Sequence, residues 1–117
     1  MVQGDLMERT IVVRFQREGF HCWPDAPVSR GYLRDKHRHL FHVEVTLEVG
    51  HNDREVELHD LKDWCERTFP EGDYGEWSCE DLAEDLLTKV LNFWGPWRWA
   101  QVSVLEDGEN GAVVAKC

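Results

Sequence analysis

Basic residues are scarce in this 117-residue chain: 13 Lys and Arg stand against 23 Asp and Glu, a formal net charge of −10 with a sequence pI near 4.9. Such an acidic surface repels phosphate backbones and anionic lipids, so we expect neither a nucleic-acid nor a membrane partner. Long apolar runs are also missing, because no stretch approaches the roughly 20 residues of a membrane-spanning helix. Residues 1–6 have neither the basic start nor the apolar run of a signal peptide. We expect a soluble, cytoplasmic domain.

Cysteine and proline are few, with four residues of each. The cysteines, at positions 22, 65, 79 and 117, show no CxxC spacing, and a secreted disulfide scaffold of this length would carry more of them. We interpret them as reduced thiols that are mostly buried or incidental, and we set Cys22 apart because His21 directly precedes it. The composition otherwise predicts a single folded domain over residues 1–117, with 42% hydrophobic residues and six Trp.

Hydrophobic periodicity predicts an α+β domain. Period-two alternation indicates half-buried strands, and apolar residues at i, i+3 and i+4 indicate amphipathic helices. The predicted elements are strands over 10–17 and 41–49, helices over 60–69 and 78–94, and a hairpin of strands over 100–106 and 112–116. Residues 22–36 lack any period and are predicted as a long loop, and residues 54–58 are compatible with a short returning strand. The order ββααββ predicts an antiparallel sheet with two helices on one face.

Two histidines, His37 and His39, lie two positions apart, so on a strand both side chains point to the same face. Their side chains point to the same face as that of Phe41, which is the apolar face of the strand. His21 continues the inward phase of the first strand, provided that no bulge intervenes. The end of the first strand lies beside the start of the second in an antiparallel pair, so the three imidazoles converge. Three nitrogen ligands with an open fourth position are typical of a catalytic zinc site and unlike a magnesium or calcium site.

An alternative interpretation of His37 and His39 is a solvated basic run over residues 36–39, and the in-phase His21 favours the metal site over it. The other histidines are predicted to be solvated or structural: His42 on the opposite strand face, His51 in a turn and His59 at a helix start.

Glu106 is the second candidate. It shares the inward phase of Val102 and Val104 at the end of its predicted strand. A buried carboxylate needs a hydrogen-bond donor, and two N–H groups of a guanidine-like edge would supply one. The alternative is an exposed Glu at a strand end, and the spacing alone does not separate the two interpretations.

Taken together, these residues resemble the family of 6-pyruvoyl-tetrahydropterin synthases and 6-carboxy-tetrahydropterin synthases. Five segments carry the resemblance across nearly the whole chain: 15–21, 37–45, 57–62, 78–83 and 102–106. They match a strand that ends in His, an H-x-H run into a strand, an acidic segment that ends in Leu-Lys, a Ser-x-Glu-x-Leu-Ala helix start, and a strand that ends in Glu.

The resemblance implies a T-fold (tunnelling fold) that assembles as a homo-trimer or homo-hexamer, with active sites between subunits. It implies that His21, His37 and His39 hold zinc, and that the zinc polarises the side-chain hydroxyls of a dihydroneopterin triphosphate-type substrate. Glu106 would anchor the amino-pyrimidine edge of the pterin. The implied activity is that of a lyase serving tetrahydrobiopterin or deazaguanine (queuosine) synthesis.

The chain departs from the family pattern at the proton-transfer positions. Tyr32 and Leu33 stand where the family has a Cys, and Asp73 lies between the helices without the His of the family's Asp-His dyad. Arg38 replaces the Gly of H-G-H. Cys22 is then a candidate catalytic base, a candidate fourth zinc ligand, or an inert thiol.

Three hypotheses follow for the function. The first is a zinc-dependent pterin synthase-like enzyme. The second is a catalytically altered or inactive zinc-bearing protein that binds a pterin or purine without the Cys and Asp-His groups. The third is a structural zinc protein whose oligomer is a scaffold, against which the inward Glu106 counts.

Overall fold

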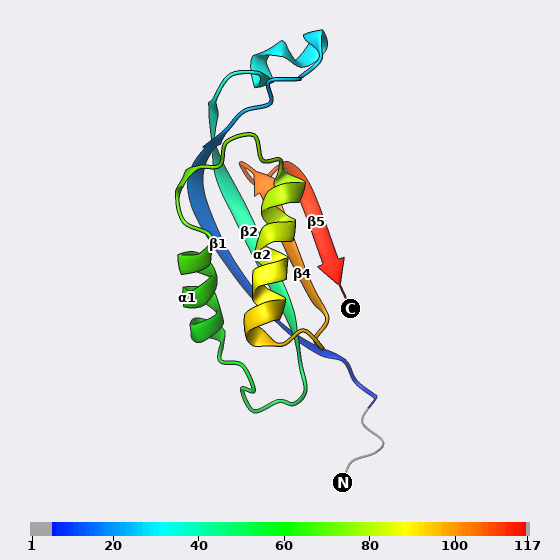
Figure 1. The fold of residues 1–117 in the computed structure, drawn as a ribbon. Helices are drawn as coiled ribbons and strands as arrows, with labels where there is room; N and C mark the ends of the chain where they lie inside the picture. Colours follow the sequence, from blue (N-terminus) through cyan, green and yellow to red (C-terminus); the bar gives the residue numbers. More distant parts are fainter. Residues whose placement is uncertain (1–5, 117) are drawn as a thin grey trace.

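The computed structural model describes residues 6–116, which form an α+β fold with one five-stranded mixed sheet (Figure 1). The elements are β1 (Arg9–His21), the 3₁₀ helix η1 (Val28–Leu33), β2 (His37–Val49), α1 (Leu58–Thr68), β3 (Gly72–Asp73), α2 (Cys79–Trp94), β4 (Ala100–Glu106) and β5 (Asn110–Lys116). The α+β class is as predicted. The predictions for residues 1–5 and for Cys117 lie outside the described residues.

The strands are ordered β3-β1-β2-β4-β5. The β1–β2 ladder is antiparallel and runs in one unbroken register from Arg9↔Val49 to His21↔His37. β4 pairs antiparallel with β2 and with β5, so the four long strands are antiparallel, as predicted. β3 adds two residues parallel to β1, which makes the sheet mixed.

One face of the sheet carries the core. Alternate residues of β1, β2 and β4 are buried there, and both helices cover this face, α1 over β1 and α2 over β4 and β5 (Figure 1). The largest fully buried side chains on the strands and helices are those of Phe41, Leu47, Leu61, Leu86, Val43, Val45, Val90, Val102, Val104 and Cys65. Burial of this apolar area is the main term that fixes the helices to the sheet.

Side chains cap the start of each α-helix. In α2 the Ser78 hydroxyl accepts a hydrogen bond from the backbone N–H of Asp81, and the Asp81 carboxylate accepts one from the N–H of Ser78, both at 3.1 Å. This capping box is the one that the sequence predicts. In α1 the Glu57 carboxylate caps the helix, which begins at Leu58, two residues earlier than predicted.

Residues 54–58 are not a strand, so that expectation is wrong. Arg54 has a positive φ of 54°, the side chain of Val56 is buried in the core, and Glu57 is already the N-cap of α1. A segment that turns and then caps a helix has no extended stretch left for strand pairing. The loop 22–36 is also more ordered than predicted, because it contains η1.

The molecule is elongated, with extents of 61 × 24 × 23 Å. The loop that contains η1 projects beyond the end of the β1–β2 pair (Figure 1). The ends of β1 and β2 that carry the predicted metal ligands therefore lie where this loop meets the body. None of the helices within residues 6–116 has the length and apolar character that a membrane crossing requires.

Candidate metal centre

The three predicted histidines come together at the end of the β1–β2 ladder. His21 pairs directly with His37, and His39 lies one position further along the same face, opposite Gly19. The ring centroids are 4.6 Å apart for His21 and His37, 4.9 Å for His37 and His39, and 5.2 Å for His21 and His39. His21 is buried, with 7% of its surface exposed. The ladder contains no bulge before His21, so the side chain of His21 points to the same face as those of His37 and His39, as predicted.

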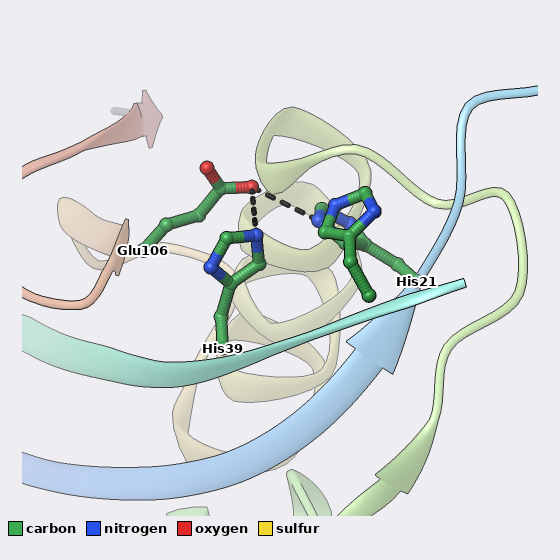
Figure 2. Close-up of side chains that lie close together, drawn as sticks. His21, His39 and Glu106 are labelled. Atoms are coloured by element: carbon green, nitrogen blue, oxygen red, sulfur yellow. Dashed lines mark ion pairs between the residues drawn. The ribbon is translucent and has the colours of Figure 1, made fainter. Parts of the chain in front are cut away.

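Glu106 completes the cluster from a third strand. It ends β4 opposite Phe41, which directs its carboxylate toward the imidazoles (Figure 2). Its Oε2 lies 2.9 Å from His21 Nε2 and 3.5 Å from His39 Nε2. One potential ligand atom from each of His21, His37, His39 and Glu106 lies within 4.8 Å of the others.

The Nδ1 atom of each imidazole faces an oxygen acceptor. His21 Nδ1 lies 2.9 Å from the carbonyl oxygen of Trp77, and His37 Nδ1 lies 2.9 Å from that of Asp35. His39 Nδ1 lies 2.8 Å from the Asp107 carboxylate. Carbonyl and carboxylate oxygens only accept, so each Nδ1 carries the hydrogen and donates it. This tautomer leaves the Nε2 lone pair of each neutral ring as the metal-binding atom.

The polar atoms at the centre fit a bound cation. The Nε2 atoms of His21 and His39 are buried and make no hydrogen bond within residues 6–116, although Glu106 Oε2 lies at ion-pair distance from both. An imidazole lone pair and a carboxylate oxygen repel each other unless a proton or a cation lies between them. Three imidazole nitrogens and one carboxylate oxygen are the donor types of a four-coordinate zinc site, and they suit magnesium and calcium poorly.

A cavity of about 470 Å³ opens beside the cluster. Its lining comes from β1, β2, β4, β5, the loops next to them and the start of α2: His21, Cys22, Trp23, Leu33, His37, Glu76, Trp77, Ser78, Cys79, Glu80, Glu106, Asn110 and Gly111. Cys22 therefore borders the cavity, and its sulfur is not one of the four converging donor atoms. A small heterocycle has room beside the metal position.

Cys79 is a cavity residue that the sequence did not predict at the site. It is the first residue of α2, is 7% exposed and faces Glu106. Burial first, and then the charge and hydrogen bonding of Glu106, raise the pKa of the Cys79 thiol to about 12. Cys79 is therefore a protonated thiol at neutral pH and not a base.

The residues at which the chain departs from the pattern of the pterin synthases are not among the four converging residues. Arg38 points to the opposite face of β2, where its guanidinium contacts the carboxylate of Glu18 at 2.6 Å. Tyr32 is 71% exposed on η1. Asp73 is bound by the ammonium of Lys36 at 2.6 Å, which lowers the pKa of its carboxyl group. The Arg38 guanidinium therefore lies on the face away from the histidines, and the Tyr32 ring lies mostly in solvent.

The remaining histidines of the described chain lie outside the cluster, as predicted. His42 is on the opposite face near Gly108, and His51 and His59 contact Glu55 and Glu57 at the surface. Asp107, in contrast, belongs to the centre and was not predicted. The backbone N–H of Leu40, and then the His39 ring, lower the pKa of its carboxyl group.

No protein-family model matches the chain, and no curated protein sequence matches it.

Proposed function

We propose that this chain is a zinc-dependent, pterin synthase-like enzyme that acts on a dihydroneopterin triphosphate-type substrate. The observation that carries the proposal is the convergence of one nitrogen from each of three imidazoles and one carboxylate oxygen, in a cluster where each Nδ1 atom faces an acceptor. Such outer hydrogen bonds are typical of metal sites and orient the ligands before the ion binds. A cavity of heterocycle size beside the cluster supports a substrate and not a purely structural ion.

Each residue of the centre has a role in this proposal. His21, His37 and His39 hold the zinc, which when bound polarises the hydroxyl groups of the substrate side chain. Glu106 accepts hydrogen bonds from the amino-pyrimidine edge of the ring, and its Oε2 also reaches the metal position when no substrate is present. Cys22 borders the same cavity and is the candidate for proton transfer.

The fold and its exposed sheet edge are compatible with this proposal. We propose that the α+β sheet with both helices on one face is a T-fold and that the chain forms a homo-trimer or homo-hexamer. The outer edge of β5 has no strand partner within residues 6–116, and an edge of this kind is available for pairing with another subunit.

A second function is favoured by the shortage of proton-transfer groups. Among the described cavity residues, the histidines are His21 and His37, both assigned to the metal, and the thiol of Cys79 is held protonated. Only Cys22 is left as a thiol base. If it is inert, the chain is a zinc-bearing protein that binds a pterin or purine without converting it.

Turnover separates the two functions. Zinc-loaded protein is incubated with dihydroneopterin triphosphate and the products are separated by chromatography, next to the variants His39→Ala and His42→Ala. His39 belongs to the cluster, while His42 lies on the opposite face of the same strand and is the matched control.

We expect a product from the parent and from His42→Ala, and none from His39→Ala. Confirmed zinc and pterin binding without any product would favour the binding protein. A parent chain that takes up no zinc would contradict both functions.

A further inference from the structure

Asp107 is the first residue after β4 and directly follows the ligand candidate Glu106. Its backbone has a positive φ of 54°. Aspartate is one of the few residues other than glycine that adopts this left-handed conformation with little strain. In this conformation the side chain of Asp107 contacts the imidazole of His39.

Asp107 joins β2 to β4 through both its backbone and its side chain. Its backbone N–H donates to the carbonyl oxygen of Leu40 at 2.8 Å, and its Oδ1 accepts from the N–H of Leu40 at 3.0 Å. Its Oδ2 accepts from His39 Nδ1 at 2.8 Å. One residue therefore holds the ends of two strands together and touches a ligand imidazole between them.

His39 differs in this respect from the other two imidazoles. The Nδ1 partners of His21 and His37 are backbone carbonyl oxygens, which no substitution removes. The Nδ1 partner of His39 is a side chain. A carboxylate partner also increases the electron density on the ring more than a neutral carbonyl does, which strengthens Nε2 as a ligand.

We propose that Asp107 is the positioning residue of the metal centre, because its carboxylate fixes His39 in the tautomer whose Nε2 can bind the ion. The inference rests on the proposed metal function and adds to it a residue that touches neither the ion nor the substrate. The Asp107 side chain is 51% exposed, so simple charge attraction to the ring is screened. The directed hydrogen bond is what carries the effect.

The variant Asp107→Asn tests the hydrogen bond with almost no change of shape. Asparagine also adopts a positive φ. Its amide oxygen is needed by the N–H of Leu40, which leaves its NH₂ group facing His39 Nδ1. Two donors cannot pair, so the tautomer of His39 with its hydrogen on Nε2 is favoured, and in that tautomer Nε2 has no free lone pair for the ion.

The matched control is Asp73→Asn. Asp73 likewise accepts a backbone N–H, that of Gly75 at 2.8 Å, and contacts a side-chain donor, the ammonium of Lys36, but it lies outside the cluster. Asp107→Gly, which tolerates the positive φ, is a second variant in case the asparagine side chain disturbs folding.

Two readouts are measured on the full chain. Long-range ¹H–¹⁵N NMR of the metal-free protein reports which nitrogen of His39 carries hydrogen, and titration with Co²⁺, followed by its visible absorption, reports metal affinity. We expect Nδ1–H in the parent and in Asp73→Asn, and Nε2–H in Asp107→Asn. We expect Asp107→Asn and Asp107→Gly to bind Co²⁺ roughly 10- to 100-fold more weakly than the parent. In a His39→Ala background, Asp107→Asn should cause no further loss.

An unchanged His39 tautomer together with an unchanged Co²⁺ affinity in Asp107→Asn would overturn the inference and leave the metal function standing. A parent chain that binds no Co²⁺ would overturn the metal function itself, with or without the expected tautomer.

Discussion

The Glu106 carboxylate occupies the one position of the centre that can serve either the metal or the substrate. Its Oε2 lies beside two imidazole nitrogens, and its side chain also borders the cavity in which a ring would lie. A carboxylate accepts two N–H groups of an amino-pyrimidine edge at once, and hydrogen bonds to a charged acceptor are about twice as strong as neutral ones. Removal of the negative charge of Glu106 therefore tests whether this carboxylate binds the ring.

Glu106→Gln should weaken the binding of a pterin to the zinc-loaded protein by roughly 10- to 100-fold, because a charged hydrogen bond contributes about 1.5–3 kcal/mol. Isothermal titration calorimetry measures the affinity. Glu80→Gln is the matched control, since Glu80 borders the same cavity but is exposed and outside the four-residue cluster. An unchanged pterin affinity in Glu106→Gln would remove Glu106 from the substrate site.

The alternation of residues along the strands predicts that the three histidines come together, but it does not predict the contact of Asp107 with them. His21, His37 and His39 meet because the β1–β2 ladder keeps one register, which alternation in the sequence already suggests. The contact between Asp107 and His39 depends instead on the offset of β4 against β2 and on a positive φ at one residue. Neither of these leaves a periodic pattern in the sequence.

At the scale of elements, the β4–β5 hairpin determines where the Glu106 carboxylate lies, because Glu106 is the last residue of β4. Leu105 pairs with Gly111, and the backbones approach so closely that a Cβ on Gly111 would overlap the carbonyl oxygen of Val104. Backbone atoms cannot rotate away as a side chain can. Any larger residue at position 111 must push β5 away from the strand that ends in Glu106.

Gly111→Ala should therefore lower the free energy of unfolding by about 1–3 kcal/mol, the usual cost of overpacking. Urea denaturation measures the change. Gly31→Ala is the control, because a Cβ there meets nothing within 4 Å. Equal stability of the two variants would show that β5 adapts without loss.

Long periodic elements could be predicted from the sequence, and short ones could not. β2, β4 and α2 are each long enough for several repeats of their pattern. The predicted and observed bounds nearly agree for β4 and α2, while β2 begins at His37, four residues before its predicted start. β3 has two residues and depends on pairing with Gly19 and Phe20 of β1, which are distant in sequence. Residues 54–58 resemble a strand in composition but are used to turn the chain and cap α1.

At the scale of the whole molecule, burial of neutral acids makes stability depend on pH. Burial raises the pKa of the Cys65 thiol from 9.0 to about 12, and burial raises that of the Tyr74 hydroxyl from 10.0 to about 12. The folded chain keeps these protons while the unfolded chain releases them, so unfolding releases protons above pH 9. The stabilisation is complete below pH 9 and is lost as the pH rises toward 12.

We expect the free energy of unfolding, measured with urea, to fall between pH 7.5 and pH 10.5. The fall should be smaller in Cys65→Ala, which lacks one of the buried groups whose pKa is raised. Comparing the two pH values within each variant cancels the loss of packing that the substitution itself causes. Equal stability of the parent at both pH values would contradict the prediction.

The centre also has an order of assembly during synthesis of the chain. His21, His37 and His39 all lie on one antiparallel hairpin near the start of the chain, while Glu106 and Asp107 follow only after α2 and β4. The three nitrogen donors are therefore translated before either carboxylate. The centre is complete only once β4 is added beside β2, so a chain that ends before Glu106 would hold the three histidines without the two carboxylates.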